Sequence, residues 1–286
     1  MYTFSNRLKI FSIVLIVVGA LGIVYGFLQA PKNTDDVVTM LSSHDTHSSE
    51  HVVEGQDHTE ISHDHAAHAH DEEHLEHVLH QLQNKPWAAL YVAALFFMLI
   101  SLGVLAFYAI QQVAQAGWSP VLFRVMQGLT AYLLPGSIIF FIILVLSGLH
   151  WNHLFVWMNA DLINPEHADF DKLIAGKSGY LSTPFFLIRA VIFILGWNFY
   201  RYISRKNCLA QDESNDNTFY KKNFKASAVF LVFFIVTESI MSWDWIMSFD
   251  PHWFSTLFGW YVFASFFVTG ITVIAMTSLY LKSKGV

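Results

Sequence analysis

The stretch that decides the fold is residues 87–110, WAALYVAALFFMLISLGVLAFYAI, which contains no charged side chain. A helix needs about 20 mostly apolar residues to cross a hydrocarbon layer roughly 30 Å thick. This stretch is long enough, and Pro86 before it suits the first turn of a helix. Residues 87–110 are therefore predicted to form a membrane-spanning helix.

Further apolar blocks of similar length occur along the chain. They comprise residues 10–28, 129–150, 181–202, 226–246 and 255–280. The first of these is too long for the apolar core of a secretory signal, which runs about 7–15 residues. The chain is therefore predicted to be an all-α, polytopic transmembrane helical bundle with about six spans.

The composition agrees with lipid as the main solvent. Of the 286 residues, 54% are hydrophobic and 13% are charged, whereas an ordinary soluble domain has about 25% charged residues. The net charge of −6 gives no indication of a nucleic-acid partner. The single cysteine, Cys208, excludes an intrachain disulfide, a cysteine-rich iron–sulfur site and a CxxCH haem attachment. No haem or iron–sulfur cluster is expected in this chain.

Residues 31–85 have a different character, with twelve acidic residues, two lysines and eleven of the fifteen histidines. We expect a largely irregular, solvated segment, with a helix over Asp64–Asn84 because apolar residues recur there at spacings of three and four. The predicted organisation is an N-terminal transmembrane helix (1–30), this histidine-rich acidic segment (31–85) and a five-helix transmembrane bundle (86–286).

The histidine tract has two interpretations. Pairs such as His70/His74 and His74/His77 have helical spacing and could bind divalent metals. The alternative is a solvated linker that gains positive charge below about pH 6.5. The irregular spacing and the lack of a Cys/His pairing favour the linker, so no metal site is assigned.

Orientation follows from the short loops, because cytoplasmic loops carry an excess of Lys and Arg. The connector between the fourth and fifth spans is basic, as are both chain ends, and six spans place all three on the cytoplasmic side. The 31–85 segment then lies outside. The outer helix ends carry an aromatic belt consisting of Trp151, Trp157, Trp243, Trp245 and Trp253.

Two ionisable residues lie well inside predicted spans, Arg189 and Glu238. A charge near the bilayer centre costs at least ~2.5–3.5 kcal/mol, so such residues are functional candidates. Counting residues from the predicted helix starts puts the two at similar depths, and we expect them to form a buried pair. It is either a structural ion pair or part of a proton path with the neighbouring hydroxyls of Thr237, Ser239 and Ser242.

A second group of polar residues gathers at the predicted outer face. His150 and His153 are three apart and are expected to share a helical face, while Asp244, Asp250 and His252 belong to the turn after the fifth span. A neutral histidine and a carboxylate at the membrane edge could accept the two protons of a quinol. The alternative is ordinary interfacial polarity where the chain leaves lipid, and spacing alone favours that.

The run SWDWIMSFDPHW (242–253) resembles the quinone-binding-type membrane subunits of bacterial alternative complex III, most closely the ActF-like subunits of the NrfD/PsrC-like (polysulphide reductase membrane subunit) family. The resemblance extends from about Trp87 to the end of the chain. It implies one four-helix NrfD-like bundle plus flanking helices. The family is built from two such bundles, so six spans are fewer than the resemblance implies.

The resemblance also implies a function. The chain would be an integral subunit of a quinol:electron-acceptor oxidoreductase in the bacterial inner membrane, beside haem c and iron–sulfur subunits and a second NrfD-like membrane subunit. Its role would be scaffolding and proton conduction, beside or at a quinol site. Of the two related membrane subunits, the other one is expected to hold the quinol.

Two other classes of protein remain as alternatives. A secondary transporter of metal ions would need ligands near the midplane, and no histidine lies within a predicted span deeper than His150. A purely structural membrane anchor for extrinsic subunits is the other alternative.

Overall fold

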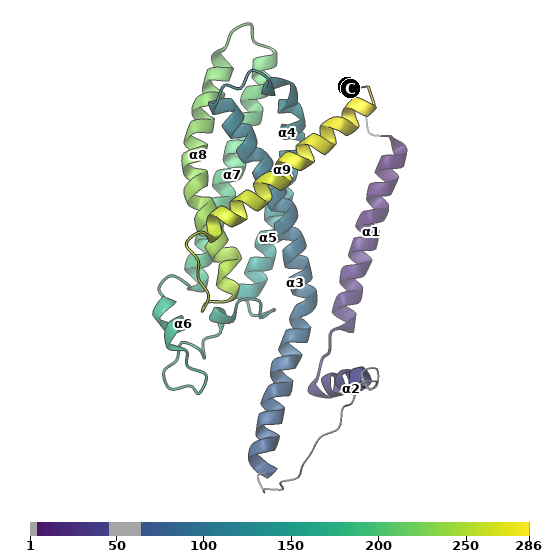
Figure 1. Ribbon diagram of the computed structural model, residues 1–286, viewed down its shortest axis with the longest axis vertical. Helices are drawn as coiled ribbons and strands as arrows, with labels where there is room; N and C mark the ends of the chain where they lie inside the picture. The colour runs from purple at the N-terminus through teal and green to yellow at the C-terminus, as the bar shows by residue number, and fades with distance from the viewer. Residues whose placement is uncertain (1–4, 46–63, 286) are drawn as a thin grey trace, which may run out of the picture. The chain divides into compact units, whose positions relative to one another are not determined.

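The computed structural model describes residues 5–45 and 64–285 (Figure 1). The chain divides into two compact units, Met1–Leu90 and Tyr91–Val286, and the boundary falls within helix α3. The helices are α1 (Asn6–Gln29), α2 (Thr34–Asp45), α3 (Asp64–Val113), α4 (Phe123–Leu129), α5 (Leu133–Gly148), α6 (Lys172–Lys177), α7 (Thr183–Asp212), α8 (Thr218–Trp245) and α9 (Phe258–Ser283). Short 3-10 turns lie at Ser119–Leu122 (η1), Thr130–Tyr132 (η2), Val156–Met158 (η3) and Met247–Phe249 (η4).

Six helical stretches of the described residues are long and apolar enough to cross a membrane, which confirms the predicted fold class. They are Asn6–Gln29, Val78–Val113, Ser119–Gly148, Thr183–Asp212, Thr218–Phe249 and Phe258–Ser283. The protein is therefore a multi-pass, all-α membrane protein. The starts of two of these helices differ from the prediction. Helix α8 starts eight residues before Ala226, and α3 runs without a break through Pro86, where a helix was predicted to begin.

The first unit contains one helix that the sequence did not predict, Thr34–Asp45, within the segment expected to be largely irregular. The helix predicted over Asp64–Asn84 is confirmed and forms the first part of α3. The start of α2 is stabilised by the Asp36 side chain, which accepts hydrogen bonds from the backbone of Lys32 and Asn33 at 3.0 and 3.3 Å. Acidic residues in a first helical turn also interact favourably with the helix dipole.

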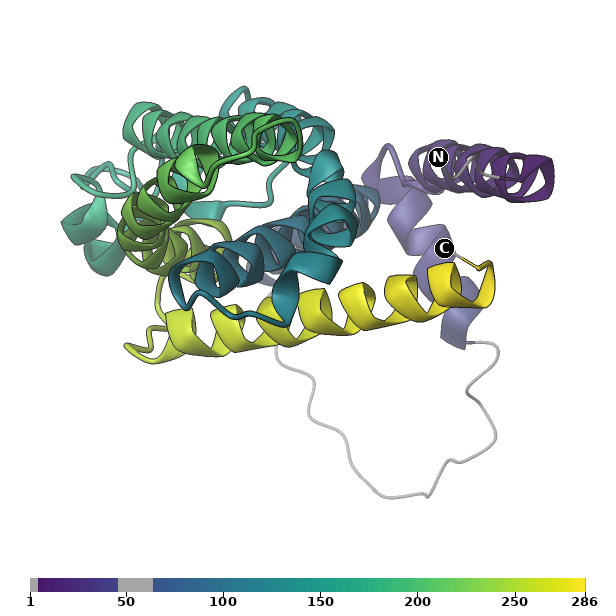
Figure 2. The same cartoon turned by 90° about the horizontal axis from the view of Figure 1, so that it is seen from above.

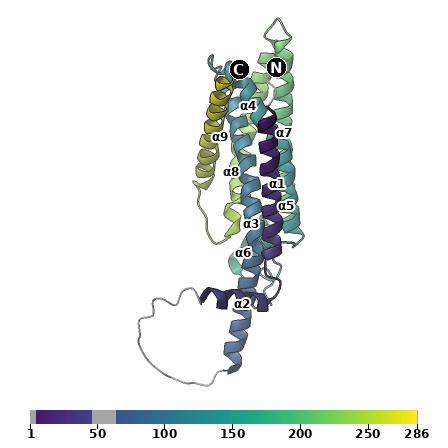
Figure 3. The same cartoon turned by 90° about the vertical axis from the view of Figure 1, so that its right-hand side faces the viewer.

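In the second unit, α3, α5, α7 and α8 run side by side and enclose a core (Figures 2 and 3). This core is apolar and rich in large rings. Its fully buried members include Tyr91, Met98, Leu102, Phe140, Phe186, Trp197 and Trp245.

The outward face of α7 is apolar, which indicates the solvent that surrounds the bundle. Large apolar side chains recur along it at spacings of three and four and are exposed, namely Phe185, Ile188, Ile192, Leu195, Phe199 and Tyr202. The opposite face, including Phe186, Phe193 and Trp197, is buried. A helix that is apolar on all sides fits a membrane span rather than a surface helix in water. The outer face of α7 is therefore suited to the interior of a membrane.

The bundle has two chemically different ends. The end formed by residues 149–182 and 246–257, called the aromatic end below, is closed by rings: Phe155 stacks on Phe249 at 4.8 Å between centroids. At the same end the Tyr91 hydroxyl donates to the Trp245 carbonyl at 2.6 Å. The opposite end, formed by residues 114–118 and 213–217 with the adjacent helix termini, is called the basic end because it carries the lysines and arginines flanking the α7–α8 connector.

Helix α9 crosses the bundle obliquely (Figure 1) and meets α3 at two glycines. A Cβ atom on Gly103 would lie 2.6 Å from the Phe266 carbonyl oxygen, and one on Gly270 would lie 3.0 Å from the Val104 nitrogen. Small residues at a crossing let two backbones approach closely, which is how membrane helices gain packing energy without a hydrophobic driving force.

Replacing Gly103 by alanine should therefore lower thermal stability. The added carbon has to displace backbone rather than a flexible side chain, and overpacking of this kind costs about 1–3 kcal/mol. The measurement is the melting temperature of the purified protein by differential scanning fluorimetry. Gly128→Ala is the matched control, because Gly128 is helical and has nothing within 4 Å of an added Cβ. Equal melting temperatures for the two variants would contradict the close crossing.

Candidate functional site

A buried ion pair in the second unit joins Arg189 of α7 to Asp244 of α8. Arg189 Nε donates to Asp244 Oδ2 at 2.6 Å, and Nη2 donates to Oδ1 at 3.0 Å. The side chains are 8% and 0% exposed. A bidentate arginine–carboxylate contact of this kind is strong and fixes orientation.

Residues at the start of α7 complete the arginine environment. Arg189 Nη1 donates to the Tyr180 carbonyl at 3.1 Å, and the guanidinium lies 4.1 Å from the Tyr180 ring centroid and 4.3 Å from that of Phe185. Partial burial and the nearby Asp244 carboxylate raise the pKa of the Tyr180 hydroxyl. This hydroxyl therefore keeps its proton beside the pair at neutral pH.

The expected pair between Arg189 and Glu238 is wrong, because Arg189 pairs with Asp244. Distance from the helix end did not identify the partner of Arg189, because Arg189 is six residues from one end of α7 and Glu238 is seven residues from the corresponding end of α8. Rotation about the axis of α8 determines which of its side chains faces α7. Thr237 and Asp244 are seven residues apart and share the face toward α7, whereas Glu238 is turned away by about 100° from Thr237.

The proton-path candidates consequently divide between two faces of α8. Thr237 faces α7, where its hydroxyl accepts from Trp197 Nε1 at 3.0 Å. Ser239 and Glu238 face away and contact each other at 3.4 Å between Oγ and Oε2. The Ser242 hydroxyl donates to the Ser239 carbonyl at 2.8 Å and lies near Gly259 at the start of α9. These five candidates do not form one cluster.

Two of the quinol-site candidates, Asp250 and His252, lie in the turn between α8 and α9. His252 Nε2 lies 2.6 Å from Asp171 Oδ2, and the Lys177 ammonium donates to the Pro251 carbonyl at 2.6 Å. Asp171 also begins α6, accepting from the backbone of Leu173 and Ile174. The structure therefore ties this turn to the 149–182 segment, while Asp244 lies inside the bundle with Arg189.

The prediction that His150 and His153 share a helical face is wrong. Helix α5 ends at Gly148, and His150 has a φ of 60°. The backbone N–H of Trp151 bonds to Leu146 O and that of His150 to Ser147 O, which is the hydrogen-bond pattern of a Schellman helix end. His150 and His153 are exposed in the segment beyond it.

A polar cluster that the sequence did not reveal lies at the basic end, around Tyr108. Its hydroxyl lies 2.7 Å from Asn223 Nδ2, 3.1 Å from Gln112 Nε2 and 3.3 Å from Gln127 Nε2. All three amide nitrogens donate, so the hydroxyl oxygen is the acceptor, and its two lone pairs are shared among three N–H groups. All four side chains are buried.

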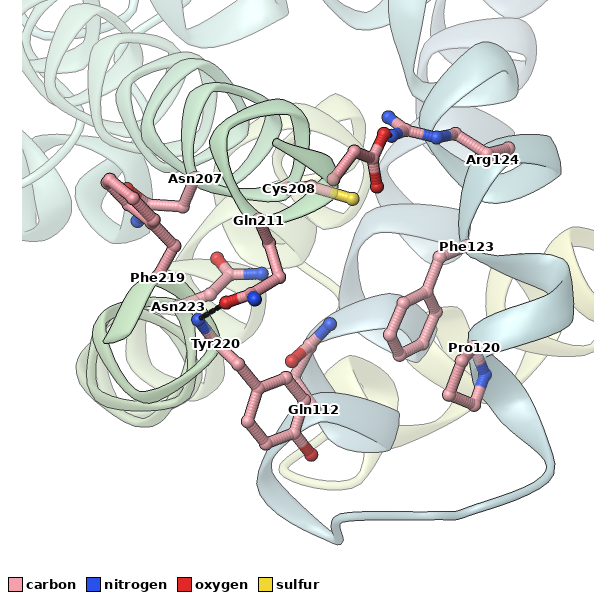
Figure 4. Close-up of a pocket in the computed structure, with 11 residues that line it drawn as sticks. Gln112, Pro120, Phe123, Arg124, Asn207, Cys208, Gln211, Phe219, Tyr220 and Asn223 are labelled. Carbon is pink, nitrogen blue, oxygen red and sulfur yellow. Dashed lines mark hydrogen bonds and ion pairs between the residues drawn. The ribbon is translucent and has the colours of Figure 1, made fainter. Parts of the chain in front are cut away.

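The cluster borders a cavity of about 300 Å³ at the basic end (Figure 4). Gln112 and Asn223 line it, and their Oε1 and Oδ1 atoms have no partner among the described residues. Cys208 also lines the cavity, and the Arg124–Asp212 ion pair lies at its edge. A share of about 30 Å³ per water gives this cavity room for several waters bound to the free amide oxygens.

Between the two ends, further polar side chains pair across the α7–α8 interface. The Tyr200 and Ser227 hydroxyls are 2.7 Å apart, and the Ser204 hydroxyl, which meets no hydrogen-bond criterion with the other described residues, lies beside both Tyr108 and Tyr200. Trp197 and Thr237 form the next pair toward Asp244. Buried polar groups thus recur from one end of this interface to the other.

Sequence reasoning missed Tyr180, Asp171, Tyr108 and the amides of Gln112, Gln127 and Asn223. The amides were the detectable signal, because a side-chain amide flanking an apolar block needs a buried partner. The described residues hold no group of three or more His, Cys, Asp or Glu side chains placed to bind a metal. The pairs His70/His74 and His74/His77 lie outside the described side chains.

Comparison with protein-family models and with curated proteins gives no match for this chain.

Removing one partner of the Arg189–Asp244 pair should be strongly destabilising. Asp244→Asn leaves the guanidinium buried without its counter-charge, and such changes cost about 3–5 kcal/mol. The measurement is the melting temperature of the purified protein. Asp212→Asn breaks the exposed pair with Arg124 and should cost at most about 1 kcal/mol. Comparable losses in the two variants would show that burial does not set the strength of the pair.

Acidification should loosen the contact between the 149–182 segment and the α8–α9 turn. Backbone hydrogen bonds from Ile174 and Leu173, together with His252, lower the pKa of Asp171 below its ordinary 3.8. Only the carboxylate makes these contacts fully, so they stabilise the fold above about pH 4 and are lost as the pH falls through the lowered value.

Hydrogen exchange over residues 160–182, corrected for the intrinsic rate, measures this change. Exchange should rise below pH 4, and Asp171→Asn should show the raised exchange already at pH 7. Asp161→Asn in the same segment is the control and should behave as the unmodified protein. A flat pH profile over this segment would refute the role of Asp171.

Proposed function

We propose that this chain is an integral membrane subunit of a quinol:electron-acceptor oxidoreductase complex of the cytochrome c type, with a scaffolding role and a proton route through its bundle. The observation that carries the proposal is the series of buried polar side chains along the α7–α8 interface. On α8 this series comprises Asn223, Ser227, Thr237 and Asp244.

The series has the length that a transmembrane route requires. Asn223 and Asp244 are 21 residues apart on α8, which corresponds to about 31 Å at a rise of 1.5 Å per residue. The hydrocarbon layer is roughly 30 Å thick. Polar side chains in a membrane interior are expensive, so a series of this length is unexpected in a bundle that only fills space.

The widest interval is between Ser227 and Thr237, ten residues along α8 and about 15 Å by the same rise. Phe230 and Phe234 of α8 fill it. A proton would cross this interval through transient waters, and the tightly packed rings would make that crossing the slow step. Such a barrier suits a complex that couples electron transfer to proton transfer, because a continuous chain of waters across the membrane would dissipate the proton gradient.

The basic end is proposed to face the cytoplasm. The lysines and arginines there support this orientation through the positive-inside rule. With six spans, the proposal puts both termini in the cytoplasm, the 31–85 segment in the periplasm and the chain in a bacterial inner membrane. The aromatic end then faces partners that carry haem c and iron–sulfur clusters, with a second NrfD-like membrane subunit alongside. The resemblance of residues 242–253 supports these partners and quinol as the reductant.

One observation favours a second candidate, a purely structural anchor. Both carboxylate oxygens of Asp244 are engaged by Arg189. Such a saturated ion pair can serve only to fix the register of two helices.

The two candidates are separated by removing hydroxyls without changing shape. Tyr200→Phe and Thr237→Val should lower proton release per electron at least twofold in the purified complex reconstituted in vesicles, while quinol oxidation under uncoupled conditions changes less. Thr272→Val, on the exposed face of α9, is the control. Unchanged proton release in both test variants would leave the anchor as the better description.

Purification of the tagged chain from its native membrane tests the assignment to a complex. Haem- and cluster-bearing proteins should copurify with it, together with a quinone detectable by its absorbance after extraction. Recovery of the chain without redox proteins would contradict the proposed function.

A further inference from the structure

A second cavity, of about 190 Å³, lies where α3, α8 and α9 meet. Its walls are apolar and aromatic, and include Ile110, Leu231, Phe234, Trp260 and Phe263. Neighbouring side chains such as Val232 and Ile235 are 71% and 57% exposed on the outer surface of α8. The cavity therefore adjoins the surface that lipid covers rather than either polar end of the bundle.

Glu238 is the one acidic side chain that lines this cavity. The residue is 5% exposed, and its Oε1 atom has no hydrogen-bond partner among the described residues. Its Oε2 atom has only a long contact, 3.4 Å, from the Ser239 hydroxyl. Leaving a buried polar atom without a partner costs about 1–3 kcal/mol, so this carboxyl requires a function that offsets the cost.

We infer that this cavity binds a lipid-soluble ring compound with a hydroxyl or carbonyl oxygen, of the quinone and quinol class, and that Glu238 makes the hydrogen bond to that oxygen. A carboxyl can donate to a carbonyl oxygen when protonated and accept from a hydroxyl when ionised, so one side chain serves both redox forms. The rings of Phe234, Trp260 and Phe263 supply flat apolar surfaces for the ligand ring.

The size and position of the cavity agree with this ligand class. Pockets that enclose a whole drug-sized molecule usually have about 300–1,000 Å³. The smaller volume here suits a single substituted ring whose apolar tail stays in the lipid. The choice of a quinone within the wider class of ring compounds rests on the proposed function, whereas the cavity and the unpaired carboxyl do not.

The other cavities are weaker candidates for the same ligand. The groove between α3 and α9, about 340 Å³, is lined by apolar residues such as Phe96, Leu99 and Tyr261, and none of its lining residues carries an unpaired buried polar atom. The basic-end cavity has several polar side chains in its lining and belongs to the proposed proton route. Of these three cavities in the described part of the chain, the one at Glu238 combines apolar walls with a single unsatisfied hydrogen-bonding group.

The test measures binding of decylubiquinone to the full chain in lipid nanodiscs. Quenching of the tryptophan fluorescence reports the binding. Glu238→Leu should weaken binding at least tenfold. Glu238→Gln, which can still donate and accept, should weaken it less than threefold. Ser265→Val changes the α3–α9 groove instead and is the matched control. Trp260→Phe should remove most of the quenching without abolishing binding.

Leu231→Trp provides a second variant that leaves Glu238 intact and fills the cavity, and it should also weaken binding at least tenfold. Binding that is unchanged in Glu238→Leu and Leu231→Trp, with melting temperatures retained, would overturn the inference, as would loss of binding in Ser265→Val alone. If either Glu238→Leu or Leu231→Trp lowers the melting temperature, the comparison rests on the variant that does not.

The measurement uses the chain alone and so separates this inference from the proposed function. Normal copurification with redox proteins, together with quinone binding that does not depend on Glu238, would contradict only the inferred binding site. Binding that depends on Glu238 in a chain that copurifies with no redox protein would contradict only the assignment to the complex.

Discussion

The Arg189–Asp244 ion pair sets the rotation of α7 against α8, and most of the polar architecture of the bundle depends on that rotation. In a low-dielectric interior a charge must meet its partner with good geometry, since misalignment leaves it unpaired at a large cost. With Asp244 facing α7, Thr237, which lies seven residues or about two turns earlier on α8, faces the same way and meets Trp197, and Ser227 meets Tyr200 nearer the basic end. A rotation of α8 that brought Glu238 toward α7 would turn Thr237 and Asp244 away from their partners.

A second constraint is the close approach of α3 and α9 at Gly103 and Gly270. Two helices that touch at one point and cross obliquely diverge on either side of the contact, and side chains do not fill the widening space completely. The two apolar cavities lie beside this crossing: one between α3 and α9 around Tyr261, the other bounded by α8 around Glu238. The glycine contact therefore explains why a membrane bundle with a well-packed core keeps open space on the side where α9 lies.

The sequence predicted the number and approximate bounds of the spans because the apolar blocks are long, free of charge and separated by polar segments. It did not predict which residues face each other. Depth along a helix follows from a rise of about 1.5 Å per residue, but counting it from the helix starts matched Arg189 with Glu238, whereas Arg189 pairs with Asp244. Orientation about the axis normally follows from an apolar stripe, but α7 and α8 are apolar on all sides, and the pattern that identifies a buried face in a soluble protein is absent. His150 and His153 failed for a different reason, since the helix ended two residues before the first of them.

In such a helix the positions of the polar residues indicate which face is buried. In a helix of a soluble protein the positions of the apolar residues do this. Asn223, Ser227, Thr237 and Asp244 lie on α8 at intervals of four, ten and seven residues, which at about 100° per residue keeps all four within an arc of about 100° around the helix. Glu238 lies just beyond one edge of this arc, about 100° from Thr237, and lines the cavity that α9 bounds. A polar residue at the edge of such a stripe, with an atom that has no partner on the neighbouring helix, needs its own explanation, because lipid offers it no hydrogen bond. Here the explanation is a cavity, and the carboxyl that lines it is the group through which a lipid-soluble ligand would be recognised.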